Sequence, residues 1–125
     1  MRKALGLVET RGMIGAIEAV DVACKTADVE VLNKHLVKGG IVTVELVGDV
    51  GAIKAAVDAA VEMTKKLGVY VSSHVIPRPD ESIYTMIEKK NIKKANEIVE
   101  VIEEIEKVLE EKITEEKTKD KKIKK

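Results

Sequence analysis

The chain has no tryptophan and no phenylalanine, and Tyr70 and Tyr84 are its two aromatic residues. Its core must therefore be aliphatic, and stacking of nucleic-acid bases on aromatic side chains is disfavoured. The single cysteine, Cys24, excludes an internal disulfide and a cysteine-based metal cluster. The 22 basic and 22 acidic residues cancel, so the overall charge does not favour nucleic acid or a membrane surface as a partner.

Long apolar runs are also missing. No stretch approaches the roughly 20 residues that a membrane-spanning helix needs, and residues 1–5 lack the apolar run of a signal peptide. We therefore expect a cytoplasmic location. A chain of 125 residues can form one domain with its own core, or one domain with an appendage.

Hydrophobic periodicity predicts a β-α-β-β-α-β order in the first part of the chain. Strands are expected over 3–10, 29–32, 41–47 and 69–76, helices over 12–27 and 49–67, and a loop over 33–40. This order is the ferredoxin-like split βαβ pattern, an α+β fold with an antiparallel sheet and both helices on one face. We expect the second face to be left uncovered, which favours a ligand, nucleic acid or another subunit there.

Several side chains in these elements have expected environments. Cys24 belongs to the apolar stripe of the first helix and is expected to be a small buried residue rather than a nucleophile. Glu45 alternates outward on its strand, and Asp49 is expected to cap the second helix with its carboxylate. His35 and His74 have no obvious carboxylate partners at metal-ligand spacing, so no metal site is predicted.

The loop before the third strand contains Lys38 followed by two glycines, Gly39 and Gly40. Adjacent glycines can adopt positive φ angles and let other backbones come close. The loop carries no nucleophile. Its sequence therefore indicates an unusual backbone shape or a close approach rather than side-chain chemistry.

The composition changes after Pro79. Residues 80–125 contain most of the glutamates and lysines but neither glycine nor proline, which favours a helix or disorder over a strand. Asp80 can cap a short helix. A heptad-like apolar seam follows, made of Ala95, Ile98, Ile102, Ile105 and Leu109 and widened by Val101 and Val108.

One amphipathic helix of this length is marginal alone in water, so it should fold by docking on its own domain or on copies of itself. We expect a domain at 1–90 and a charged helical tail at 91–125, of which 117–125 is frayed. The tail could also recruit a cargo protein or a neighbouring assembly.

Four blocks together resemble a known family. They are KALGLVET at 3–10, AIEAVD at 16–21, GDVGAIKAA at 48–56 and HVIPRP at 74–79. In this order and spacing the chain resembles the single-domain hexameric shell proteins of bacterial microcompartments. The resemblance implies cyclic hexamers tiled edge to edge around enclosed enzymes, without catalysis, cofactor or metal. Implied partners are copies of the chain, other shell proteins of the same microcompartment and, through the tail, enclosed enzymes.

The resemblance implies a pore loop formed by Val37, Lys38, Gly39 and Gly40 on the sixfold axis. The common family pattern is Lys-Ile-Gly-Ser-Gly, so Lys38 stands in place of its first glycine and Gly39 in place of its serine. Six Lys38 side chains pointing to the axis would favour small anionic metabolites. A Lys38 side chain pointing away would only make the loop more soluble.

The resemblance also implies two residues at the contact between hexamers. Lys25 would pack against its counterpart in the next hexamer. Arg78, held between Pro77 and Pro79, would hydrogen-bond backbone carbonyls of the neighbour, a task that suits the five donors of a guanidinium.

Two other function classes are compatible with this fold. A regulatory protein of the PII-like kind would be a trimer with nucleotide in its subunit clefts, but the long signalling loop and phosphate-binding cluster expected there are not visible. An enzyme has less support because no triad, P-loop or metal cluster occurs. The charge runs of the tail have the spacing of solvated helix faces.

Overall fold

The computed structural model describes the backbone of residues 3–124 and their side chains apart from those of residues 88–92 and 94. The chain divides into two compact units between Ile83 and Tyr84. The first unit contains a four-stranded sheet with two helices, and the second consists of the main part of one long helix.

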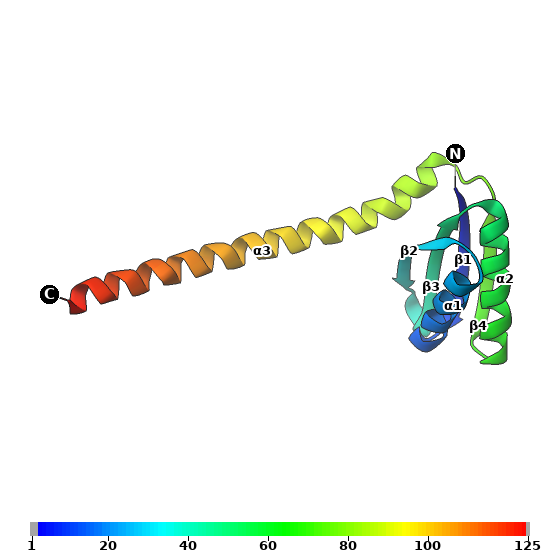
Figure 1. Ribbon diagram of the computed structural model, residues 1–125, viewed down its shortest axis with the longest axis horizontal. Coiled ribbons are helices and arrows are strands. Elements are labelled where there is room, and N and C mark those ends of the chain that lie inside the picture. Colours follow the sequence, from blue (N-terminus) through cyan, green and yellow to red (C-terminus); the bar gives the residue numbers. More distant parts are fainter. Residues whose placement is uncertain (1–2, 125) are drawn as a thin grey trace. The chain divides into compact units, whose positions relative to one another are not determined.

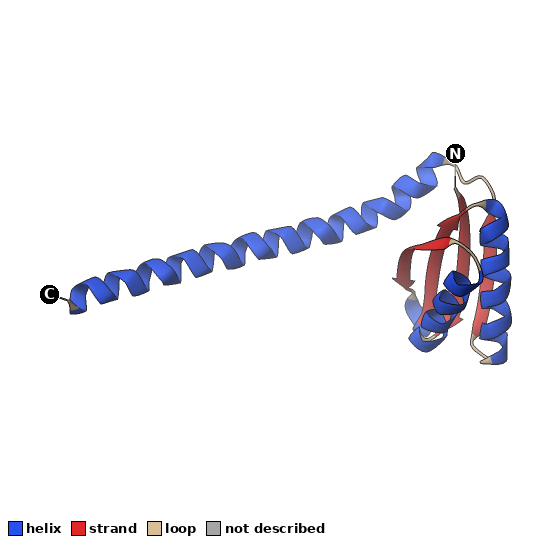
Figure 2. Cartoon of the chain, viewed as in Figure 1, coloured by secondary structure: helices blue, strands red, loops and turns tan. Residues whose placement is uncertain are grey.

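The first unit has the predicted β-α-β-β-α-β order (Figure 1). Its elements are β1 (Ala4–Arg11), α1 (Met13–Thr26), β2 (Val29–Leu36), β3 (Ile41–Gly48), α2 (Val50–Lys66) and β4 (Tyr70–Ile76). A short 3-10 turn, η1 (Lys38–Gly40), joins β2 to β3. The strands lie in the order β2-β3-β1-β4, and all neighbours are antiparallel. Figure 2 shows the strands in red and the helices in blue. The predicted α+β fold is therefore confirmed.

Both helices pack on the same face of the sheet, and two glycines show how closely. A Cβ built on Gly6 of β1 would lie 2.8 Å from Val57 Cγ2 of α2. A Cβ built on Gly15 of α1 would lie 3.1 Å from the Cβ of Thr10, also on β1. Because residues 6 and 10 of one strand point to the same face, α1 and α2 share that face. Small buried residues of the helices, including Ala19 and Ala56, complete this aliphatic core.

The second strand is longer than predicted. The segment 33–36 was expected to be loop, but β2 continues to Leu36 and pairs with β3 along that length. Asn33, Lys34 and His35 give this segment a polar composition that does not suggest a strand. It is an edge strand, and the register shifts between Val31 and Asn33, so backbone pairing with β3 on one side stabilises it in place of side-chain packing.

The second face of the sheet is less bare than expected. Leu5 of β1 and its partner Val47 of β3 point to this face, yet both are buried. The prediction that Glu45 points to solvent is also wrong, because its side chain is only 8% exposed. Further along the chain, Pro79 is fully buried in the segment after β4.

Two side-chain predictions on the helices are wrong. Asp49 occupies the N-cap position of α2, but its carboxylate makes no capping hydrogen bond. Cys24 is exposed rather than buried, with its thiol 3.9 Å from the carbonyl oxygen of Val29. Its neighbour Ala23 takes the buried position on that turn of α1. The predicted end of α2 is confirmed, since Gly68 has φ 71° and its amide donates to the carbonyl of Lys65.

The tail is one continuous helix, α3 (Glu81–Ile123). Asp80 caps its start, because Asp80 Oδ1 accepts hydrogen bonds from the Ser82 amide at 3.0 Å and from the Ser82 hydroxyl at 2.6 Å. The expected short helix and the expected seam therefore lie on the same helix. Fraying of residues 117–124 in solution stays a prediction, and residue 125 lies outside the described residues.

Candidate functional site

The loop at Lys38–Gly40 has the unusual backbone that its glycines predict. Gly39 has φ 80° and Gly40 has φ 76°, values in the left-handed region that favours glycine. A Cβ built on either residue would meet nothing within 4 Å. The loop is therefore open around both backbones, and the whole segment 36–40 is exposed.

Two hydrogen bonds hold this loop in place. The Val37 amide donates to the Ile41 carbonyl at 2.8 Å, which closes the turn between β2 and β3. The Gly12 amide donates to the Gly40 carbonyl at 2.8 Å, which ties the loop to the start of α1. The loop is thus a fixed part of the sheet end, although its outer surface faces solvent.

Lys38 contributes the charge of the loop. Its side chain is exposed and has no ion pair or hydrogen bond to any other residue that the structure describes. A fixed backbone therefore carries a cation whose charge is not compensated within the described chain. Such a group can attract an anion.

The same end of the sheet has exposed apolar side chains on both of its lateral edges. On the β2 edge, Leu36 is 73% exposed and Val37 lies beside it. On the β4 edge, Ile14 is 83% exposed and lines an apolar pocket together with Leu67 and Val69. The strand order β2-β3-β1-β4 separates these two surfaces, and the loop lies between them at the start of β3.

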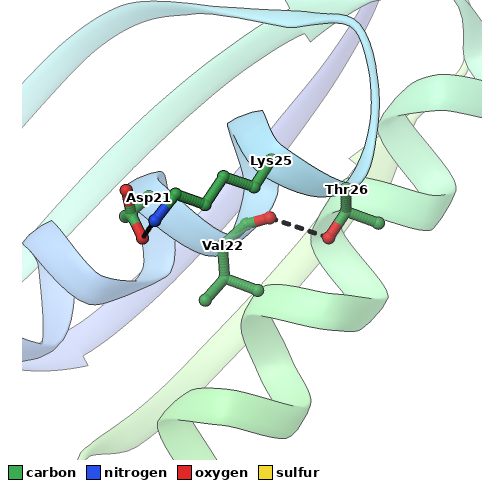
Figure 3. A network of polar contacts seen from close by, with 4 residues as sticks. All are labelled: Asp21, Val22, Lys25 and Thr26. Atoms are coloured by element: carbon green, nitrogen blue, oxygen red, sulfur yellow. Dashed lines mark hydrogen bonds and ion pairs between the residues drawn. The ribbon is translucent and has the colours of Figure 1, made fainter.

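Lys25 lies on the last turn of α1 and folds back along that helix. Its ammonium is 2.7 Å from Oδ2 of Asp21, one turn earlier (Figure 3). The hydrogen bond to Asp21 and the charge of that carboxylate raise the pKa of the Lys25 ammonium above its ordinary value. Next to it, the Thr26 hydroxyl donates to the Val22 carbonyl at 2.7 Å (Figure 3). Both side chains at this exposed helix end are thereby oriented.

Arg78 follows the end of β4 and is exposed. On one side it adjoins Pro77, and on the other side it adjoins the fully buried Pro79. Among the described residues the guanidinium has no hydrogen-bond or ion-pair partner. Its five donors are therefore presented to solvent from a short, anchored segment.

The structure pairs two side chains on the second face of the sheet, the half-buried His35 and the buried Glu45, that the sequence does not predict. His35 Nε2 of β2 lies 3.0 Å from Glu45 Oε1 of β3, so the expectation that His35 has no carboxylate partner is wrong. The second oxygen of Glu45 is buried without a hydrogen-bond partner in the described chain. Residues ten positions apart on antiparallel neighbours are brought together only by the hairpin and its bulge, and no local pattern reports this register.

The described residues contain no group of three or more His, Cys, Asp or Glu side chains that could hold a metal ion. Of the helices in the described range, none combines the length and hydropathy needed to span a bilayer.

The comparison with protein families decides the classification. The model of the BMC domain matches residues 4–79, which covers every strand and both helices of the first unit. The chain belongs to the BMC domain family. The match ends at residue 79, just before α3 begins, so the long helix lies outside the matched BMC domain.

Curated relatives of this BMC domain are shell proteins. The microcompartment shell protein PduA of Citrobacter freundii is 42% identical over 88 residues, which cover 70% of this chain and 95% of PduA. The shell protein EutM of Salmonella typhimurium is 46% identical over 77 residues, 62% of this chain and 80% of EutM. The carboxysome shell protein CsoS1A of Hydrogenovibrio crunogenus is 42% identical over 90 residues, 69% of this chain and 94% of that protein.

A solved structure has the same fold. The crystal structure of a microcompartment protein from Desulfitobacterium hafniense DCB matches this BMC domain with a TM-score of 0.64 and 33% sequence identity. The match covers 68% of this chain and 48% of the other, so this chain spans about half the length of that protein.

Proposed function

We propose that this chain is a structural tile of a bacterial microcompartment shell and assembles into cyclic hexamers with a central pore. The shell proteins PduA, EutM and CsoS1A among its relatives support the shell role. The main observation in favour of a hexamer is the position of the open loop, which lies between two exposed apolar edges at one end of the sheet. The shell would lie in the cytoplasm and would include other shell proteins.

Two different apolar surfaces on one protomer suit a closed ring. In a head-to-tail interface, one surface of a protomer contacts a different surface of the next, and the series closes when the rotation allows it. Leu36 on the β2 edge would pack against Ile14 and Leu67 on the β4 edge of the neighbour. The loop between these edges would then face the axis of the ring.

The pore would be lined by Val37, Lys38, Gly39 and Gly40. Gly39 and Gly40 leave space because a Cβ at either position would meet nothing within 4 Å apart from its neighbours along the chain. Six copies of Lys38 would place like charges around one opening. Their mutual repulsion decreases when an anion binds between them, so the pore would favour small anionic metabolites.

Lys25 and Arg78 would form the contacts between hexamers. Arg78 has unused donors on an anchored segment, which suits hydrogen bonds to backbone carbonyls of a neighbouring tile. Lys25 is already oriented by Asp21, so its aliphatic part is presented at the exposed end of α1. Because this ion pair already restricts the Lys25 side chain, packing it against a neighbour would cost less side-chain freedom.

Native mass spectrometry of the full chain tests the ring. The wild type is expected to be a hexamer, and Ile14→Glu is expected to be mainly monomeric because it places a carboxylate in the apolar interface. Ile123→Glu is a matched control, because Ile123 on α3 is 81% exposed and Ile14 is 83% exposed. The control should remain hexameric. A monomeric wild type, or an Ile14→Glu variant that stays hexameric, would contradict the proposal.

A further inference from the structure

The helix α3 carries a broad apolar stripe, interrupted by Glu106 and Lys112, that the chain itself leaves exposed. Its side chains are each 48% to 60% exposed, and they are Ile98, Val99, Val101, Ile102, Ile105, Val108, Leu109 and Ile113. These eight residues are here called the α3 stripe. An isolated helix with so many β-branched residues gains little from helix propensity, so burial of the stripe is needed to stabilise it.

The width of the α3 stripe indicates more than one neighbour. At about 100° per residue, the arc from Val108 on one rim to Val99 on the other covers about 180° of the helix surface. The seam between two helices of a simple coiled coil uses only the narrower a and d positions. A helix in a ring of six contacts two neighbours in directions about 120° apart, and such an arrangement buries an arc of this width.

The charges beside the α3 stripe limit the choice of partner. Glu104 and Glu111 adjoin the Val108 rim, and Glu103 and Glu110 adjoin the Val99 rim. Identical helices side by side therefore bring carboxylates together, which weakens their association at low salt. Free copies in dilute solution would gain little from this arrangement. Helices already tethered to one ring are different, because their effective concentration is of the order of millimolar.

We propose that the α3 helices of one hexamer assemble into a parallel bundle through the α3 stripe. This inference rests on the proposed hexameric ring. Cyclic symmetry makes the six helices parallel and in register, so the same residue of each copy lies at the same level. Ile105, at the centre of the α3 stripe, meets its counterparts inside the bundle, whereas Lys107 points away from them.

Cysteine cross-linking in the full chain tests the bundle. The exposed Cys24 is first replaced by alanine, and one cysteine is then introduced by Ile105→Cys or, as the matched control two residues away, by Lys107→Cys. Under mild oxidation, Ile105→Cys is expected to form disulfide-linked pairs at least fivefold faster than Lys107→Cys. The rate should not change on tenfold dilution, because the reacting helices belong to one ring.

Salt supplies a second readout. Raising the ionic strength from about 0.01 M to 1 M shortens the Debye length from about 30 Å to 3 Å, which screens the glutamates on both rims. Cross-linking of Ile105→Cys should therefore become faster with salt. Equal rates for the two cysteines, a rate that falls on dilution, or a rate that falls with salt would each overturn the bundle.

Failure of the bundle can be distinguished from failure of the ring. Ile105→Glu in the full chain should abolish preferential cross-linking of a cysteine introduced by Ile98→Cys, while native mass spectrometry still shows a hexamer. A hexamer in which cross-linking through Ile98→Cys is unaffected by Ile105→Glu contradicts the bundle alone. A monomeric wild type contradicts the ring and removes the basis of the bundle.

Discussion

Replacement of Gly15 by alanine should destabilise the BMC domain, because α1 lies against the sheet at this residue. The added Cβ would lie 2.6 Å from Val69 Cγ2, 3.1 Å from Thr10 Cβ and 3.3 Å from Val69 Cβ. Both neighbours are β-branched, and two of these atoms are Cβ atoms that cannot turn away from the contact. Overpacking of this kind costs about 1–3 kcal/mol, against a gain in helix propensity of about 0.5–1 kcal/mol.

The net loss in the free energy of unfolding is therefore about 0–2.5 kcal/mol, centred near 1 kcal/mol. For a domain of this size, each 1 kcal/mol lowers Tm by about 4–8 °C. Thr10 is fully buried and its hydroxyl donates to the Gly12 carbonyl, so a shift of Thr10 would also disturb the residue that holds Gly40. Gly15→Ala should thus affect the candidate pore loop as well as stability.

Gly51→Ala is the matched control for this substitution. Gly51 lies on the exposed surface of α2, and a Cβ there would meet nothing within 4 Å. The same chemical change should raise the free energy of unfolding by about 0.5 kcal/mol, because alanine reduces the freedom of the unfolded chain. The two substitutions are therefore expected to have opposite signs.

Differential scanning calorimetry at one protomer concentration measures both variants, because association contributes to apparent stability. The double variant Gly15→Ala with Val69→Ala should lose less stability than the two single losses added together, since alanine at 69 removes the closest atom. Equal Tm shifts for Gly15→Ala and Gly51→Ala, or strict additivity with Val69→Ala, would refute the packing argument.

Three further predictions concern the charged candidates. In calorimetric titrations at low salt, the hexamer should bind citrate. Lys38→Ala should reduce the citrate affinity at least tenfold, whereas the control Lys34→Ala should not. Equal losses of affinity in the two variants would contradict an anion site at the loop. Arg78→Lys should leave the hexamer intact but reduce assembly into sheets seen by electron microscopy, because one ammonium does not replace the guanidinium fork; unchanged sheets would exclude this role. Asp21→Asn should lower the pKa of the Lys25 amine in an NMR titration, and an unchanged pKa would show that the ion pair is not populated in solution. Because the folded-state pKa is raised, the stabilisation from the pair is present below the unfolded pKa and lost as pH rises through the folded value.

Much of the fold could be read from local patterns. The apolar spacing of α2 matches the residues that face the sheet, and its end follows from Gly68, whose positive φ suits glycine. In α1, by contrast, the small residues Ala16 and Ala19 are buried and the larger Ile14 is exposed. The loop glycines were likewise predictable, because Gly39 and Gly40 adopt backbone angles that other residues rarely adopt. The side-chain environments were less accessible. Sequence position alone predicts that Cys24 is buried and that Asp49 caps α2. In the structure Cys24 is exposed, and the Asp49 carboxylate makes no capping hydrogen bond.

The sequence by itself determined the order of the elements, the family and the position of the glycine loop, because each is recorded in residue types close together along the chain. Only the tertiary structure decided that Glu45 is buried against His35, since the register of β2 on β3 joins residues that no local spacing relates. It also decided the surroundings of the loop. Sheet pairing puts Leu36 on one edge and Ile14 on the other, and a protomer needs both edges at one end to close a ring.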